Sequence, residues 1–318
     1  MPMRTAAREI LVIKLGAFGD MIMIDGALRD IRANHPDARI TVLTGRAYWR
    51  IMERCPFVDA IEIDRRTHPI LLGALVDLRR RLRAGRYDMV YDLQNNRRTR
   101  FYRRFMLPGT PWSGTAPGCS HRYAATNPKQ IPVLDRLAGQ LAAAGLKVSR
   151  ATRPDVSWMV DDPADILNEA GVGEGYILLV PGSAARHPQK RWPGYAALAG
   201  RLLGDGHQVV TAPGPEEIDL CRGIPGTTLL EEGQPVDFFK LAGLARRARF
   251  VVGNDTGPTH LAAHAGAKGL ALFGPHTAAA MTCIDRRFKV IEVPDLGDLA
   301  VETVHAAIRA EIGPAQGA

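Results

Sequence analysis

The sequence has few cysteines and no long apolar run, and each shortage excludes a class of protein. Its four cysteines lie far apart among 318 residues and form no C-x-x-C pair, so neither a zinc site nor a disulfide framework is indicated. A reducing cytoplasm fits this pattern best. No run approaches the length of a membrane span, and the apolar run at 10–13 is too short for a signal peptide and ends at Lys14. Apolar residues still make up 46% of the chain, enough for sizeable cores.

Negative charge is scarce in the first half of the chain. Residues 1–160 contain 27 Lys/Arg and 14 Asp/Glu, a formal charge of +13, whereas residues 161–318 contain 14 and 19, a charge of −5. Such a field attracts an anionic partner, either a phosphorylated lipid, a membrane surface or a nucleic acid. A solvated helix face explains the run at 79–83 better. For the run at 97–104 both interpretations stay open, because aromatic residues alternate with the arginines.

Strand-like and helical patterns alternate along the whole chain, which predicts βαβ units and parallel sheets in two similar α/β domains. A stretch at 108–132 is expected to be irregular, and 153–162 reads as a linker. The expected strands are 10–14, 39–43, 60–63, 88–93, 176–180, 207–212, 227–230, 250–253, 269–273 and 289–293. The expected helices are 21–34, 46–54, 68–84, 133–145, 194–204, 215–222, 235–247, 258–265 and 298–312.

Three loops follow predicted strands and lead into helices, at 16–20, 181–190 and 253–257. Open α/β sheets bind ligands at the carboxyl ends of their strands. The third loop ends in Thr256-Gly257-Pro258, where a helix N-terminus presents backbone N–H groups and Gly257 lets an anion approach the backbone. This geometry suits a phosphate, although a helix capped by Asp255 or Thr256 explains the same residues.

Asp20 ends the loop Gly16-Ala17-Phe18-Gly19-Asp20, which is not a G-x-G-x-x-G dinucleotide fingerprint. The spacing alone favours an aspartate that caps the following helix. The functional alternative is an ionised carboxylate in a ligand site, able to accept a proton.

Several polar residues at the second-half strand ends have two interpretations each. Lys190 is either solvated or a point charge that neutralises a pyrophosphate beside the Ser183 loop. Glu216 and Glu217 either both lie in the first turn of a helix, where a carboxylate interacts favourably with the positive end of the helix dipole, or one of them binds a ribose. His260 is either packed in a helix or within reach of the same phosphate.

These residues, in this order, resemble the ADP-heptose:lipopolysaccharide heptosyltransferase family, which is glycosyltransferase family 9. The Asp255-Thr256-Gly257-x-x-His260 block and the Lys190-x-Trp192-Pro193 block are the specific parts of the match, which runs from about residue 10 to 275. The resemblance implies a GT-B fold, with two Rossmann-like domains whose parallel sheets face each other across a cleft. An acceptor-binding domain is expected at 1–155 and a nucleotide-sugar-binding domain at 156–318, with the last helix packing back on the first domain.

The resemblance also implies an inverting, metal-independent sugar transfer with no cofactor, in which Asp20 is the general base. A nucleotide sugar, expected to be ADP-heptose, would be the donor, and a lipopolysaccharide core or related phosphorylated glycolipid the acceptor. The donor-binding residues it implies are Ser183, Lys190, Glu216, Glu217, Asp255, Thr256, Gly257, His260 and Gly274. The acceptor-binding residues expected are Gly16, Gly19, Arg97, Arg98, Arg103 and Arg104.

The expected place of action is the cytoplasmic face of the inner membrane, with peripheral attachment and no nucleic-acid partner. Four other functions are considered at this point. They are a sugar-nucleotide epimerase or hydrolase on the same scaffold, a transferase that modifies a protein side chain, nucleic-acid binding through Arg97–Arg104, which ranks low because no RNA-binding signature accompanies it, and a non-catalytic nucleotide- or lipid-binding protein. Acceptor-independent turnover of the donor would favour the first, and binding without turnover the last.

Overall fold

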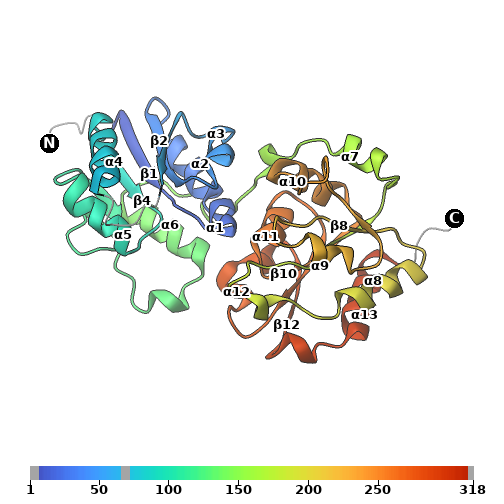
Figure 1. Ribbon diagram of the computed structural model, residues 1–318. Coiled ribbons are helices and arrows are strands. Elements are labelled where there is room, and N and C mark those ends of the chain that lie inside the picture. The colour runs from blue at the N-terminus through green and yellow to red at the C-terminus, as the bar shows by residue number, and fades with distance from the viewer. Residues whose placement is uncertain (1–6, 66–71, 314–318) are drawn as a thin grey trace. The chain divides into compact units, whose positions relative to one another are not determined.

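The computed structural model describes residues 7–65 and 72–313, which form two compact units with a boundary between Pro154 and Asp155 (Figure 1). Each unit contains one six-stranded sheet in which every paired strand is parallel. Strands and helices alternate in both units, as the sequence predicts.

The sheet of the first unit has the strand order β3-β2-β1-β4-β5-β6. Its strands are β1 (Glu9–Ile13), β2 (Arg39–Gly45), β3 (Ala60–Asp64), β4 (Met89–Asp92), β5 (Trp112–Gly114) and β6 (His121–Arg122). Residues 10–13 of β1 are fully buried. A parallel strand buried on both faces has an unbroken apolar sequence instead of an alternating one, and this explains why the expected strand at 10–14 is confirmed.

Six α-helices accompany this sheet among the residues that the structure describes in the first unit. They are α1 (Phe18–Met23), α2 (Asp25–Asn34), α3 (Trp49–Glu53), α4 (Leu72–Ala84), α5 (Arg97–Phe101) and α6 (Val133–Ala143). A π-helical turn, η1 (Tyr102–Met106), continues α5. The helix expected at 21–34 is divided at Ile24, and the first residues of the helix expected at 68–84 lie outside the described residues.

The stretch at 108–132 is more regular than expected, because it contains β5, β6 and a 3₁₀ turn at Pro128–Gln130. Strands of three and two residues are too short to show alternation in the sequence. Contacts from other segments hold them instead. The backbone N–H of Trp112 donates to the Ser120 hydroxyl at 2.7 Å, and the Gln140 side chain donates to the carbonyl oxygen of Ser113 at 3.3 Å.

The sheet of the second unit has the order β12-β11-β10-β7-β8-β9. Its strands are β7 (Ile177–Val180), β8 (Val209–Thr211), β9 (Thr227–Thr228), β10 (Phe250–Asn254), β11 (Gly269–Phe273) and β12 (Lys289–Glu292). Its helices are α7 (Ala164–Glu169), α8 (Tyr195–Gly204), α9 (Ile218–Arg222), α10 (Phe238–Arg247), α11 (Gly257–His264), α12 (Ala279–Thr282) and α13 (Val301–Ile312). The short helices α7 and α12 were not expected from the sequence.

The last helix, α13, packs against α8, and its Val304 and Ile308 are fully buried in the core of the second unit. Its expected contact with the N-terminal domain stays a prediction. The segment expected to be a linker is also attached to this unit, since the backbone N–H of Val156 donates to the carbonyl of His264 at 3.0 Å.

Candidate active site

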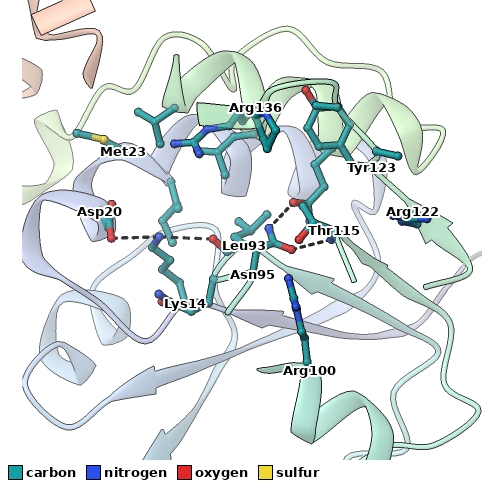
Figure 2. A pocket seen from close by; sticks show the side chains of 18 of the residues that line it. Lys14, Asp20, Met23, Leu93, Asn95, Arg100, Thr115, Arg122, Tyr123 and Arg136 are labelled. Atoms are coloured by element: carbon teal, nitrogen blue, oxygen red, sulfur yellow. Dashed lines mark hydrogen bonds and ion pairs between the residues drawn. The ribbon is translucent and has the colours of Figure 1, made fainter. Parts of the chain in front are cut away.

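A cavity of about 790 Å³ lies in the first unit, where β1, β4 and β5 reach their carboxyl ends (Figure 2). Loops after these strands and the helix α6 supply its walls. The lining residues that carry polar or charged groups are Lys14, Asp20, Gln94, Asn95, Arg100, Thr115, Arg122, Tyr123, Thr126, Arg136 and Gln140. The loop at 16–20 therefore delivers its aspartate to a ligand-sized space, as the strand-end argument predicts.

Asp20 lies in the first turn of α1 but is not its N-cap, because the N-cap position is Ala17 and Asp20 is the third residue of the helix. Its Oδ2 accepts a hydrogen bond from the backbone N–H of Ala17 at 3.2 Å, and its role as a base stays a prediction. The same oxygen forms an ion pair with the Lys14 ammonium at 3.4 Å, and the side chain is 40% exposed. Lys14 Nζ also donates to the Leu93 carbonyl at 3.4 Å, so both groups are held beside the cavity (Figure 2).

The two glycines of this loop have different surroundings. Gly16 is buried with a φ of +121°, and a Cβ there would lie 2.4 Å from the Tyr48 ring, so only glycine fits. Gly19 lies inside α1 and is partly buried. Neither lines the cavity, and acceptor contacts from either stay a prediction.

Positive charge dominates the lining of the cavity. Lys14, Arg100, Arg122 and Arg136 contribute cations, and Asp20 contributes the one carboxylate of the lining. Arg100 and Arg136 enter from opposite sides in Figure 2. The Nε atom of Arg136 is buried and has no hydrogen-bond partner among the described residues. The cavity is thus built for an anionic ligand.

A side-chain amide network fixes one wall of the cavity. Asn95 has a left-handed backbone with a φ of +50°, a conformation that asparagine tolerates. Its side chain donates to Gln140 Oε1 at 2.7 Å and accepts the backbone N–H of Thr115 at 2.8 Å. Gln94 accepts the N–H of Leu15 at 2.8 Å and so ties the end of β4 to the end of β1.

The four arginines expected to bind the acceptor do not line this cavity. Arg98 pairs with both oxygens of the buried Asp64, each at 2.8 Å, and contacts the Tyr102 hydroxyl. Arg103 donates to the carbonyl oxygens of Pro117 and Gly118, both at 2.9 Å. Arg97 and Arg104 are exposed. Arg122 and Arg136 were missed by the sequence analysis, because they are isolated in sequence and only the fold brings them together.

The second unit contains a separate cluster at the carboxyl ends of β10 and β11. Lys190 Nζ donates to Asp255 Oδ2 at 2.5 Å and to the Asp255 carbonyl at 3.2 Å, and His260 Nε2 lies 3.3 Å from Asp255 Oδ1. Burial alone would raise the pKa of Asp255. The hydrogen bond from His260 and the charge of Lys190 outweigh it, so the pKa is held below its ordinary value of 3.8.

The fully buried Asn254, which the sequence analysis did not single out, joins the loops around this cluster. Its Nδ2 donates to the carbonyl oxygens of Pro181 and Gly182, at 2.9 and 3.3 Å. Its Oδ1 accepts from the backbone N–H of Trp192 and the hydroxyl of Tyr195, both at 3.2 Å. One amide therefore fixes the loop after β7 and the start of α8 beside the end of β10.

The other expected donor residues lie around the same strand ends. The Ser183 hydroxyl donates to the His187 carbonyl at 2.8 Å and accepts from Arg191 at 3.1 Å. Glu217 accepts the N–H of Gly214 at 2.9 Å and packs against Gly182, whereas Glu216 is exposed.

Thr256 precedes α11 without capping it through its side chain, and Gly257 is the first residue of that helix. Lys190, Asp255, Gly274 and His276 line one small depression. The backbone N–H groups at the start of α11 therefore receive no hydrogen bond from the Thr256 side chain, and their binding of a donor phosphate stays a prediction.

Comparison with known proteins identifies the family. Residues 75–300 match the family described as Glycosyltransferase family 9 (heptosyltransferase). The chain belongs to glycosyltransferase family 9. Lipopolysaccharide heptosyltransferase 2 of Escherichia coli (strain K12) is 27% identical over 322 residues, which cover 90% of this chain and 88% of that protein. The chain is therefore a glycosyltransferase of the heptosyltransferase type.

Solved structures show the same fold. A family 9 glycosyl transferase from Veillonella parvula has a TM-score of 0.79 at 20% identity, over 97% of this chain and 99% of its own. E. coli heptosyltransferase WaaC with ADP-2-deoxy-2-fluoro heptose has a TM-score of 0.73 at 20% identity, over 95% and 99%. The predicted GT-B fold is confirmed by these likenesses. No helix within residues 7–65 and 72–313 is long and apolar enough to cross a membrane.

The low pKa of Asp255 predicts a specific pH dependence of stability. A carboxyl whose pKa is lower in the folded than in the unfolded protein stabilises the fold above the unfolded value of about 3.8, and this contribution is lost as pH falls through the folded pKa. Asp255→Asn should therefore lower the melting temperature near neutral pH, and the deficit should shrink below pH 3.8. The exposed Asp219→Asn is the control. A deficit that does not change with pH would show that packing, and not charge, is lost.

Proposed function

We propose that this chain transfers a heptose from ADP-heptose to a lipopolysaccharide core or related phosphorylated glycolipid, with inversion and without a metal ion. Two similar proteins support the choice of substrates. A relative that covers most of the chain is named a lipopolysaccharide heptosyltransferase, and a structural neighbour is described with an ADP-heptose analogue. The observation that carries the proposal is Asp20, the one carboxylate in a lining with four cations.

The geometry of the first unit suggests how the acceptor is activated. An anionic acceptor would be held by Arg100, Arg122 and Arg136, with a sugar hydroxyl directed toward Asp20. Asp20 would accept the proton of that hydroxyl while its oxygen attacks the anomeric carbon of the donor, on the face opposite the diphosphate. Attack from that face inverts the configuration. The capping bond from Ala17 and the ion pair with Lys14 restrict the carboxylate to one position.

The second unit offers positive charge for the leaving diphosphate. Lys190 and the uncapped N–H groups at the start of α11 would stabilise the negative charge that develops as the glycosidic bond breaks. In the absence of donor, Asp255 neutralises Lys190. A bound diphosphate would share the ammonium with Asp255, and Asp255 is kept ionised by the same contacts that lower its pKa.

We place this activity at the cytoplasmic face of the inner membrane, with the protein attached peripherally and without a nucleic-acid partner. A lipid-linked acceptor is found at a membrane surface, and the +13 charge of residues 1–160 suits an anionic one. The four cysteines are buried and form no disulfide in the part of the chain that the structure describes, which suits a reducing compartment such as the cytoplasm.

The first test concerns the base. Asp20→Asn keeps the size of the side chain and one acceptor oxygen but cannot take a proton, so kcat should fall roughly 10²- to 10⁴-fold. Donor affinity, measured by calorimetry with ADP-heptose, should stay unchanged because the expected donor residues belong to the second unit. Near-normal turnover of Asp20→Asn would leave Asp20 with the capping role alone.

The second test concerns the diphosphate. Lys190→Ala should weaken ADP-heptose binding and lower the transfer rate on the order of 10²- to 10³-fold, because the leaving group loses a charged contact. Lys268→Ala, at an exposed lysine of the same unit, is the matched control. Chelator treatment should leave the wild-type rate unchanged. A strict requirement for Mg²⁺ or Mn²⁺ would overturn the metal-free mechanism.

The third test decides which arginines bind the acceptor. Arg122→Gln and Arg136→Gln each remove a charged hydrogen-bond donor from the cavity, so each should raise the acceptor KM about 10-fold or more. Arg97→Gln removes the same group from an exposed position outside the lining, and all three variants are compared on a soluble, short-chain acceptor, so that any effect on membrane docking does not enter the KM. A rise in KM for Arg97→Gln, with normal values for both cavity variants, would move the acceptor site to the surface around Arg97.

A further inference from the structure

Three of the five large hydrophobic side chains that are exposed among the described residues lie on two neighbouring helical segments of the first unit. Phe105 is 50% exposed and Phe101 39%, both on α5–η1, and Val76 on α4 is 65% exposed. Exposed apolar side chains are ordinary when scattered singly, but a group of them on one part of the surface marks an interaction site.

Contacts between the two segments show that these side chains belong to one surface. The helix α4 packs against η1, and Arg83 Nε donates to the carbonyl of Met106 at 3.1 Å. Residues seven apart on a helix share a face, so Val76, Arg79 and Arg83 form an exposed stripe along α4, and Arg83 of this stripe contacts η1. On the second segment, the Phe101 and Phe105 rings contact each other at a tilt of 42°, with centroids 4.9 Å apart.

The charges of this surface are of one sign. Residues 97–106 contain five arginines and no carboxylate. Arg98 and Arg103 are used inside the fold, whereas Arg97 and Arg104 remain exposed beside the two phenylalanines. The one acidic residue of α4, Asp77, is paired with Arg80 and Arg81. We call Val76, Arg79, Arg97, Phe101, Arg104 and Phe105 the basic–apolar face.

We propose that the basic–apolar face docks this chain on a bilayer that contains anionic phospholipid. The proposal rests on the proposed function, because docking on a bilayer brings the enzyme to its substrate only if the acceptor is linked to a lipid. Phe101, Phe105 and Val76 enter the boundary between headgroups and acyl chains, while the arginines bind lipid phosphates.

The Arg104 side chain can contact both the apolar part of a bilayer and its aqueous headgroup region. Its guanidinium lies over the Phe105 ring, 5.5 Å from the centroid. A long arginine stem lies along apolar surface while its head stays with water and phosphate. The ring and the cation are therefore presented together, as a surface between lipid and water requires. The Arg104 and Phe105 side chains are both exposed, so neither contributes to the buried core of the unit.

Co-sedimentation of the full chain with vesicles tests this docking without any substrate. Wild-type protein should bind vesicles containing phosphatidylglycerol and should not bind vesicles of phosphatidylcholine alone, and the binding should weaken as salt is added. Phe101→Ser/Phe105→Ser should lower the partition coefficient at least about tenfold, since binding strength scales with the apolar area that enters the interface. Leu203→Ser/Leu220→Ser removes two exposed apolar side chains of the second unit and should bind as wild type.

A soluble, short-chain acceptor separates this proposal from the proposed transferase activity. Phe101→Ser/Phe105→Ser should transfer heptose to that acceptor at the wild-type rate, which also shows that the variant is folded. Equal vesicle binding by both double variants would overturn the docking face, whatever the enzyme's activity. So would a wild-type dimer in sedimentation velocity that the Phe101→Ser/Phe105→Ser variant loses, because a second copy would then occupy the face. If the wild type and both double variants bind vesicles as expected but none of them transfers heptose, only the proposed function is overturned.

Discussion

Parallel pairing of strands is the constraint on which both sites depend. When all strands of a sheet run in one direction, every loop that follows a strand emerges at the same edge, however far apart the strands are in sequence. In the first unit this brings Lys14, after β1, within 3.4 Å of the Leu93 carbonyl, after β4. In the second it brings Lys190 to Asp255, 65 residues later. Lys14 and Asp255 directly follow buried strands, so their positions follow from the core of each sheet.

Polar contacts between loops then convert this proximity into fixed positions. Asn254 binds two carbonyl oxygens of one loop and two donors from another, all in a fully buried place. An unpaired amide there would be costly, so the loops are held together by the requirement that each polar group find a partner. Gln94 and Asn95 do the same in the first unit. These amide side chains therefore decide where the loops that carry the expected ligand-binding residues are placed.

The strand-end loops could be predicted from the sequence because each signal is local. Apolar runs, glycines and the start of a helix predicted the places of Asp20, Lys190 and Asp255, and the family resemblance predicted the GT-B fold that the comparisons confirm. Arg122 and Arg136 could not be found this way. The first lies on a strand of two residues and the second on a helix, and neither has a motif around it. Their common cavity depends on β5 and β6, which are too short to leave a periodic pattern.

The charge of the first half has three separate uses, which a count of arginines cannot distinguish. Arg98 neutralises a buried aspartate and Arg103 holds two carbonyl oxygens, so these charges stabilise the fold. Arg100, on the same short helix, lines the cavity, while Arg97 and Arg104 remain at the surface. Successive residues of a helix point in directions about 100° apart, so one basic run necessarily serves several surroundings. The net positive charge attracts an anionic partner to this unit, and the direction in which each arginine points from the helix decides which of them can bind it.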